Sequence, residues 1–221
     1  MIKPPGIIDN TIELPGRCYA IRMMPHEVDI ADIHDKWDQA YADAMKLIVD
    51  GNVDEGKEIL EELYRRKYNR AGHTLSYGYG AGWFGEPDSK KYLSLVYALV
   101  LKGYSAAFSD YGFCYDCGIG VKKSMRWALY WYRKAADYDD EAQNILGLCY
   151  EEGIGVLKDY EKAYYWFSLA VKNGAGACAE HNLARCFRLG RGISEDKEMA
   201  NKYEALAVKH GFHKKDKGTV L

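Results

Sequence analysis

The segment Cys149-Tyr150-Glu151-Glu152-Gly153-Ile154-Gly155-Val156 is one of three similar stretches in this chain, and the others begin at Cys114 and Cys186. The first glycine of the motif occurs at Gly118, Gly153 and Gly190, in steps of 35 and 37 residues. A period near 35 residues predicts a stacked array of helix pairs rather than one globular core. Such an array has no built-in reaction centre and usually presents an extended binding surface.

Helical periodicity surrounds each glycine motif. After the first glycine, an alanine, an aromatic residue and a second alanine recur at i, i+3 and i+7: Ala128, Trp131 and Ala135; Ala163, Trp166 and Ala170; Ala200, Tyr203 and Ala207. Before the glycine, a small and a large residue stand four apart, followed by another small one: Ala107, Tyr111 and Gly112; Ala142, Leu146 and Gly147; Ala179, Leu183 and Ala184. Each set falls on one helical face. We therefore predict that each repeat is a first helix (helix A), a Gly-x-Gly turn that ends it, and a second helix (helix B) packed against the first through small residues.

The complete pattern is Ala-x-x-x-Leu-Gly-x-x-Tyr-x-x-Gly-x-Gly-Val-x-x-Asp-x-x-x-Ala-x-x-Trp-Phe. It resembles the Sel-one-like repeat, a relative of the tetratricopeptide repeat. Residues 142–174 match almost position by position, residues 107–139 lack the Asp and the closing glycine, and the third repeat departs mildly at Ala184, Phe187 and Tyr203. The resemblance implies an α/α solenoid and, for the family, adaptor or scaffold roles rather than catalysis.

The repeat pattern weakens toward the N-terminus. Ala71, Leu75, Tyr79 and Gly82 stand 36 residues before their counterparts in the first recognisable repeat. Further upstream, 37–49 and 54–67 are predicted to be two amphipathic helices. The expected fold is thus an all-α, α/α superhelical solenoid of about five helix pairs with a short N-terminal arm. The predicted boundaries are an extended arm or hairpin at 1–35, a divergent helix pair at 36–70, a divergent repeat at 71–106, repeats at 107–141, 142–178 and 179–212, and a basic tail at 213–221.

Proline marks the N-terminal boundary. Four of the five prolines lie before residue 26, and the fifth, Pro87, falls in a predicted turn. A helical array requires this absence of proline from its body. Residues 1–35 are too apolar for a free tail, so we expect an extended arm or small hairpin there, and with it any β structure.

Composition excludes several classes of partner. The formal net charge is −2, which gives no nucleic-acid or membrane signal. No apolar run approaches the ~18 residues that a membrane span needs. The N-terminus lacks a charged-then-apolar signal pattern, so export by that route is not expected. We expect a cytoplasmic protein whose partner is a protein or peptide, with neither nucleic acid nor membrane bound.

The six cysteines do not form a recognisable disulfide framework. Some exported members of the resembled family pair a cysteine of helix A with one of helix B, but here Cys114, Cys149 and Cys186 all occupy equivalent helix A positions. Free thiols in a reducing compartment are therefore expected. The Cys114-x-x-Cys117 spacing suits a redox pair or half of a zinc site, but no second pair of ligands at similar spacing is visible. We favour a packing role and expect no metal.

Catalytic motifs are weak. The segment from Gly80 to Gly85 matches G-x-G-x-x-G, but a dinucleotide site needs a strand before it, and here a helix is predicted. A turn of the array is the favoured interpretation. We find no nucleophile and base that spacing would bring together, and we predict no catalytic residue and no cofactor.

One stripe of helix A is a candidate peptide-binding row if helix A lines the concave face, as in related solenoids. Next to the core face at i, i+4 and i+7, its members are His73 and Tyr77; Ser109, Phe113 and Asp116; Asn144, Leu148 and Glu151; and His181, Arg185 and Arg188. The row changes from neutral and aromatic, through acidic, to basic, which suits an extended peptide with a basic and an acidic stretch. Phe113 and Arg185 are the expected anchors; the alternative for Phe113 is burial by a neighbouring repeat. The alternative is that all of these positions are merely solvated.

Three functions stay open at this point. The favoured one is a non-enzymatic adaptor or scaffold that binds a protein or peptide on its concave face. The second is an enzyme or small-ligand-binding protein with a site in the groove or near Gly78–Gly85. The third is a structural subunit of a larger assembly. The sequence does not indicate the partner or the oligomeric state.

Overall fold

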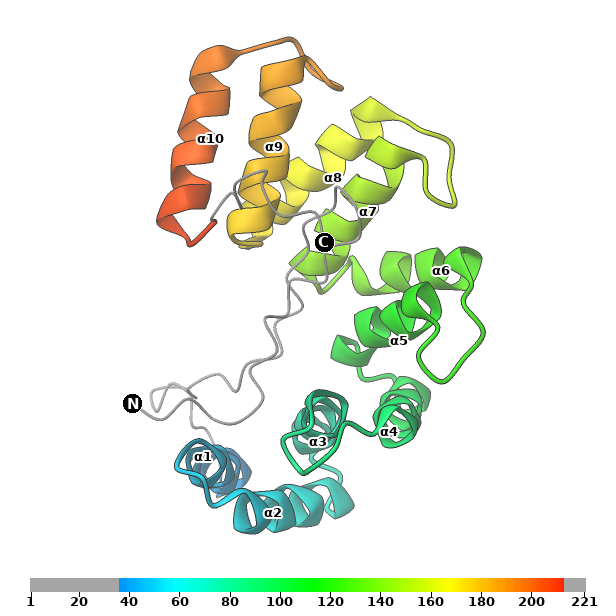
Figure 1. Ribbon diagram of the computed structural model, residues 1–221, viewed down its shortest axis with the longest axis vertical. Coiled ribbons are helices and arrows are strands. Elements are labelled where there is room, and N and C mark those ends of the chain that lie inside the picture. Colours follow the sequence, from blue (N-terminus) through cyan, green and yellow to red (C-terminus); the bar gives the residue numbers. More distant parts are fainter. Residues whose placement is uncertain (1–35, 213–221) are drawn as a thin grey trace. The chain divides into compact units, whose positions relative to one another are not determined.

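The computed structural model describes residues 36–212, which form ten α-helices (Figure 1). They are α1 (Lys36–Val49), α2 (Val53–Arg65), α3 (Asn69–Ala81), α4 (Ser89–Leu101), α5 (Ala106–Cys117), α6 (Met125–Ala135), α7 (Asp140–Glu152), α8 (Tyr160–Asn173), α9 (Ala177–Leu189) and α10 (Lys197–Lys209). No strand occurs among these residues, so the predicted all-α fold of five helix pairs is confirmed for the described part. The arm or hairpin expected at 1–35 and the basic tail at 213–221 lie outside it.

The described residues divide into two compact units. Unit 1 comprises residues 36–135 with helices α1 to α6, and unit 2 comprises residues 136–212 with helices α7 to α10. In both units each odd-numbered helix A packs against the following helix B. In unit 1, α1, α3 and α5 lie along one side, and α2, α4 and α6 lie along the other (Figure 1). None of the described helices is both long and apolar enough to cross a membrane.

Helix A of each recognised repeat ends at the first glycine of its motif. Gly118, Gly153 and Gly190 have φ of 80°, 73° and 61°, a left-handed conformation that residues with a Cβ avoid. The backbone N–H of Gly153 donates to the carbonyl of Cys149, which satisfies one of the last carbonyls of α7. The prediction that these glycines end helix A is confirmed.

Aspartate begins several of the helices. Asp139 accepts hydrogen bonds from the backbone N–H groups of Glu141 at 2.9 Å and Ala142 at 3.3 Å, at the start of α7. Asp159 accepts from the N–H of Lys162 at 3.0 Å, at the start of α8. The side chains of such N-cap residues satisfy amide groups that lack an intrahelical partner.

Glycine within helix A brings the paired helix B close. A Cβ placed on Gly147 would lie 2.5 Å from the ring of Phe167, and one on Gly112 would lie 2.9 Å from the ring of Tyr132. Both rings are fully buried, whereas Trp166 is half-buried. In these two repeats the ring that lies against the glycine is therefore at i+4 from the first alanine.

The rings at i+3 also contact the paired helix A: Trp131 lies 5.1 Å from Tyr111, and Tyr203 stacks on Phe187 with centroids 5.8 Å apart. The sequence interpretation included the i+3 contact and missed the i+4 ring, for which the glycine leaves room.

Candidate binding face of the A helices

In unit 1, one carboxylate of α5 joins two of the predicted site residues on α3. The hydroxyl of Tyr77 donates to Asp110 Oδ1 at 2.8 Å, and His73 Nε2 lies 2.6 Å from Asp110 Oδ2. The rings of His73 and Tyr77 meet edge to face with centroids 4.7 Å apart. Asp110 is buried. These contacts hold two side chains of one repeat in fixed positions through a residue of the next repeat.

A hydrogen bond between two hydroxyl groups links α1 to α3. The hydroxyl groups of Tyr41 and Thr74 are 2.7 Å apart, and both residues are buried. The guanidinium of Arg70 lies 4.6 Å from the centre of the Tyr41 ring. Neighbouring A helices of unit 1 are thus joined by polar pairs as well as by apolar packing.

In unit 2, a fully buried carboxylate lies between two arginines. Glu151 on α7 accepts hydrogen bonds from Arg185 on α9, whose Nε lies 3.3 Å from Oε1 and whose Nη2 contacts Oε2. Arg191 Nη1 donates to Glu151 Oε1 at 2.8 Å, and this bond raises the pKa of Arg191. The Arg191 guanidinium also lies 5.1 Å from the centre of the ring of Tyr160, the residue that begins α8. A buried carboxylate requires such compensation, because an unpaired buried charge is costly.

A pair of amides also connects α7 and α9. The Asn182 amide nitrogen donates to Asn144 Oδ1 at 2.9 Å, and both side chains are buried. Asn182 Oδ1 has no hydrogen-bond partner among the described residues. An acceptor left unpaired in a buried position costs free energy.

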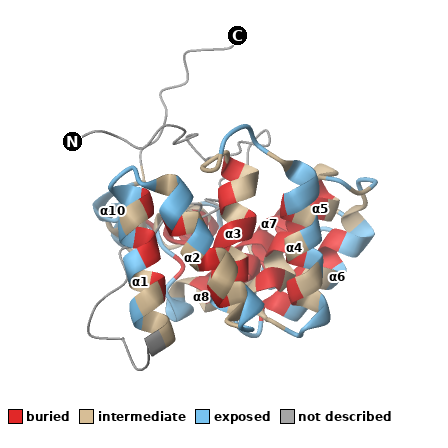
Figure 2. Ribbon diagram, turned by 90° about the horizontal axis from the view of Figure 1, so that it is seen from below, coloured by how far each residue is buried: buried red, intermediate tan, exposed pale blue. Residues whose placement is uncertain are grey.

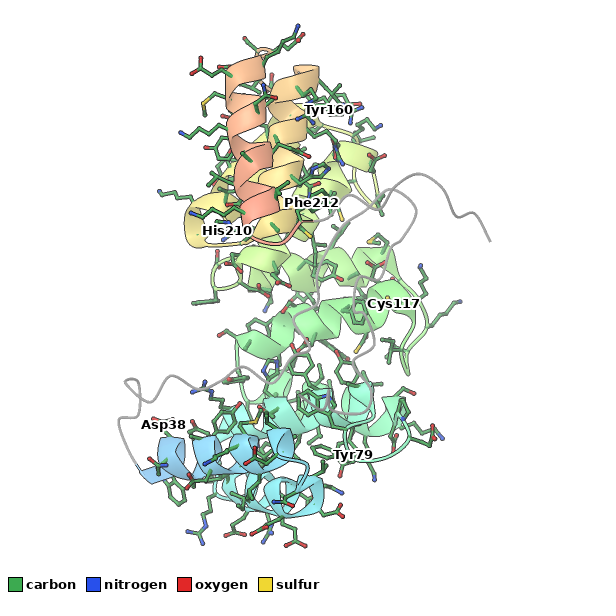
Figure 3. The ribbon with its side chains drawn as sticks, turned by 60° about the vertical axis from the view of Figure 1, so that its left-hand side comes forward. Asp38, Tyr79, Cys117, Tyr160, His210 and Phe212 are labelled. Carbon is green, nitrogen blue, oxygen red and sulfur yellow. The ribbon has the colours of Figure 1, made fainter. Side chains whose placement is uncertain are left out.

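A second acidic residue organises the end of unit 2. Glu204 Oε2 on α10 lies 3.0 Å from His181 Nδ1 and 3.6 Å from Arg188 Nη2, both on α9. The His181 ring stacks on Phe212 with centroids 4.1 Å apart. Phe212, labelled in Figure 3, follows α10. Glu204 occupies the i+4 position that carries an aromatic residue in the other two recognised repeats. The replacement provides a charge partner for two of the predicted site residues.

The eleven predicted site residues differ in exposure. The buried ones are Phe113, Asp116, Asn144, Leu148 and Glu151. The half-buried ones are His73, Tyr77, Ser109, His181, Arg185 and Arg188. Phe113 and Leu148 are only 7% and 1% exposed, so neither presents the open apolar anchor that the sequence analysis expected at this position. The peptide-binding role of the row stays a prediction, and its reachable members are the half-buried ones.

A column of polar residues that joins neighbouring A helices was not predicted from the sequence. Its members directly precede the large core residue of helix A: Thr74, Asp110 and Asn182. Each pairs with the preceding helix A of its own unit. A polar residue beside a buried position of helix A is the signal that could have revealed this column, because a buried polar group needs a partner.

The five cysteines within residues 36–212 show no sign of a reactive site. Cys114, Cys117, Cys149, Cys178 and Cys186 are free thiols. Burial, together with the charge of Asp110, raises the pKa of Cys114 to about 12, and burial raises that of Cys117 to about 11. Both thiols are therefore protonated at neutral pH and are poor nucleophiles and metal ligands. Within residues 36–212, no group of three or more His, Cys, Asp or Glu side chains is arranged to hold a metal ion.

The glycine-rich segment near residue 80 is a packed turn between two helices. It joins α3 to α4, so no strand precedes it. The Trp83 N–H donates to the Gly78 carbonyl at 2.8 Å, and the Phe84 ring lies against Gly78, where a Cβ would be 2.1 Å from it. The ring occupies the space next to the glycine. This geometry agrees with a turn of the array and differs from the strand-to-helix loop of a dinucleotide site.

Comparison with known proteins assigns the repeats. The Sel1 repeat model matches residues 109–138, 140–174 and 179–212. A protective antigen of uropathogenic Escherichia coli strains with an SLR fold has 28% identity and a TM-score of 0.64, over 71% of this chain and 33% of that one. A Sel1 repeat protein from Oxalobacter formigenes has 24% identity and a TM-score of 0.71, over 78% of this chain and 70% of that one. This chain thus spans about one third of the first structure. No curated protein matches its sequence.

The family model and both solved structures agree, because each is a Sel1 or SLR repeat. Sel1-repeat proteins generally serve as protein-interaction scaffolds, and the family is typically non-enzymatic. The solved structures share the helical-repeat fold found here in both units. Residues 109–138, 140–174 and 179–212 are therefore Sel1 repeats, and the chain is similar to Sel1-repeat proteins.

Proposed function

We propose that this chain is a non-catalytic adaptor that binds an extended segment of a partner protein on the faces of its A helices. The observation that carries the proposal is the pair of arginines on α9, Arg185 and Arg188, whose side chains are 23% and 40% exposed. Acidic residues of neighbouring helices hold both in place. The similarity to Sel1-repeat proteins supports the adaptor role in general terms, and the arginines supply the particular surface.

Arg185 has donor capacity left after it pairs with Glu151. Its Nε and Nη2 are used on that carboxylate, and its Nη1 has no hydrogen-bond partner among residues 36–212. Arg191 and Arg185 together carry two positive charges against one negative charge on Glu151. The cluster therefore retains a positive charge that suits a carboxylate or a backbone carbonyl of a bound segment.

Fixed side chains lower the cost of binding. Long side chains lose rotamer freedom when a partner immobilises them, which opposes association. Here the ion pairs of Arg185 with Glu151 and of Arg188 with Glu204 already restrict both guanidinium groups. The loss on binding is correspondingly smaller.

Site-specific photo-crosslinking tests the proposal. A photoreactive phenylalanine analogue replaces Arg188 in one variant and Tyr165 in another; Tyr165 lies on helix B and is 57% exposed, which makes it the matched control. We expect a defined partner to be crosslinked from position 188 and not from position 165. In parallel, Arg188→Glu should reduce co-purification of that partner, and Lys197→Glu, at an 85% exposed side chain, should not.

Two results would contradict this proposal. One is equal crosslinking from positions 188 and 165. The other is undiminished co-purification of the partner by Arg188→Glu.

We further propose a reducing, cytoplasmic compartment, which suits free thiols at five positions. Detection of the chain in an exported fraction would contradict that part.

A further inference from the structure

Helix α6 and the turn before it are strongly basic. From Gly118 to Ala136 the chain contains no Asp or Glu. The same segment carries five basic residues, Lys122, Lys123, Arg126, Arg133 and Lys134, all of them exposed. None of the five forms an ion pair with another described residue, whereas Glu62, Glu151 and Glu204 elsewhere are each paired. The segment therefore presents uncompensated positive charge.

The charges share one helical face with exposed aromatic rings. Arg126, Trp127, Tyr130, Arg133 and Lys134 follow one another at i, i+1, i+4, i+7 and i+8, which places them on one side of α6. The opposite side carries the buried residues of α6 (Figure 2). Trp127 is 51% exposed and Tyr130 is 42% exposed. We call Arg126, Trp127, Tyr130, Arg133 and Lys134 the α6 basic-aromatic face.

Neighbouring rings hold these aromatics in place. The Trp127 and Tyr130 centroids are 5.7 Å apart, and those of Tyr130 and Trp131 are 5.0 Å apart, both edge to face. The ring centroids of Trp127 and Tyr115 of α5 are 6.2 Å apart, and Lys134 Nζ lies 5.3 Å from the centre of the Tyr130 ring. Rigid aromatic side chains offer large contact area at a low cost in conformational entropy.

The other repeats show that the fold does not require this face. At the positions equivalent to the five residues, α8 carries Glu161, Lys162, Tyr165, Ser168 and Leu169. In α10 they are Glu198, Met199, Lys202, Ala205 and Leu206. Neither helix combines three cations with two aromatic residues. The buried alanines of helix B recur in all three repeats, so packing explains those residues and leaves the α6 face unexplained.

We propose that the α6 basic-aromatic face docks an acidic segment of a partner protein. Carboxylates of the segment would pair with Arg126, Arg133 and Lys134, and an apolar or aromatic side chain between them would pack on Trp127 and Tyr130. Charge-assisted hydrogen bonds from arginine to carboxylate are among the stronger ones, and buried aromatic residues and arginines dominate binding energy at interfaces. This face lies on a B helix and is a second surface, independent of the A-helix faces proposed above.

The charge of the rest of the chain favours a short acidic segment over a nucleic acid. The whole chain carries −2, so the residues other than these five basic ones carry −7. A helix of 11 residues is roughly 16 Å long, which matches a few residues of an extended peptide. A long polyanion would run past α6 onto a negatively charged chain, where it would be repelled.

Fluorescence anisotropy tests the proposal on the full chain. The probe is a fluorescein-labelled peptide of twelve residues with alternating glutamates and two central phenylalanines, and its match has glutamine in place of glutamate. We expect the acidic peptide to bind, the glutamine peptide to bind at least about tenfold more weakly, and the affinity to fall as salt rises. Arg126→Glu with Arg133→Glu should abolish binding. Lys202→Glu with Lys209→Glu, the same charge change on α10, should leave it within about twofold.

A second pair of variants separates the two chemistries of the face. Trp127→Ala with Tyr130→Ala keeps every charge and should weaken the acidic peptide at least about tenfold. Circular dichroism confirms that each variant is folded. The proposal is overturned if the acidic peptide does not bind, if folded α6 variants bind it as well as the parent chain, or if a single-stranded DNA of twelve nucleotides binds more tightly than the peptide.

Discussion

The contact between Gly147 and Phe167 predicts that Gly147→Ala destabilises the parent chain but stabilises a chain that carries Phe167→Ala. Gly147→Ala is helix-favouring on its own and should stabilise an ordinary helix by about 1 kcal/mol. In this chain the added Cβ would lie 2.5 Å from two ring carbons of Phe167 and 3.1 Å from a third. The ring cannot swing into solvent, because Phe167 is fully buried. We therefore expect Gly147→Ala to destabilise the chain by about 1–3 kcal/mol, as overpacking does.

Removal of the ring reverses this outcome. Phe167→Ala leaves a cavity between α7 and α8 and should cost about 3–5 kcal/mol. The three atoms nearest to the added Cβ all belong to the Phe167 ring, so the Phe167→Ala background removes the closest contacts that oppose Gly147→Ala. There the second substitution should stabilise by about 0.5–1 kcal/mol through helix propensity alone. The coupling energy of the cycle is then roughly 1.5–4 kcal/mol, compared with about 0.5–3 kcal/mol for residues in contact.

Urea unfolding followed by far-ultraviolet circular dichroism measures the four free energies. Hydrogen exchange of peptides from α7 and α8 assigns the change to unit 2. Tyr165→Ala provides the control on the same helix, because Tyr165 is 57% exposed and should change the free energy of unfolding by no more than about 0.5 kcal/mol. Equal effects of Gly147→Ala in both backgrounds would refute the close packing of helix B against this glycine.

Three further perturbations follow from the described contacts. Arg185→Ala removes the hydrogen bonds of Arg185 to the buried Glu151 but leaves that of Arg191, so it should lower the free energy of unfolding by about 1.5–3 kcal/mol in the same urea assay; a loss below 1 kcal/mol would contradict the pairing. Asp196→Ala removes the N-cap of α10 and should cost about 1 kcal/mol, measured by thermal unfolding, with an unchanged midpoint as the opposing result. Burial and the charge of Glu151 raise the pKa of Cys186 to about 12. The stability that follows from this raised pKa is fully present below about pH 8.5, the usual thiol pKa of the unfolded chain, and is lost as pH rises toward 12. Cys186→Ala should therefore lose less stability than the parent chain between pH 8 and 10.5, and parallel pH profiles would contradict this.

Local features of the fold were predictable because they depend on residues close in sequence. The positions of Gly118, Gly153 and Gly190 predict where helix A ends, since few residues other than glycine adopt a left-handed cap at low cost. The alanine faces predict which sides of the helices meet. Both depend only on spacing within one repeat, which the sequence states directly.

The i+4 aromatic could have been found by comparing the two helices of a pair. Phe167 was present in the repeat pattern, next to Trp166, and periodicity alone does not choose between adjacent aromatics. The choice follows from Gly147 on the facing helix, whose missing Cβ leaves room for one ring. The register of the two helices, and not the period of either, decides which ring is buried.

The candidate site was less predictable because it depends on contacts between repeats. The predicted stripe was derived from one helix at a time, as if its outer side met only solvent. In the structure, Asp110 and Asn182 reach back to residues of that stripe on the preceding helix A. The exposure of a stripe residue thus depends on the rotation between successive repeats, which no single repeat encodes.

The repeats also separate residues that serve the fold from residues that serve this chain. Where helix B carries the same buried alanine in every recognised repeat, packing is a sufficient cause. Where one repeat departs, as at Trp127 and Arg133 on α6 or Glu204 on α10, packing does not explain the change, because the same fold forms without it. Glu204 pairs with two residues of α9, so contacts within unit 2 explain it. The α6 departures are exposed and unpaired with any acid in residues 36–212, and this difference from Glu204 is the observation on which the proposed docking of an acidic segment rests.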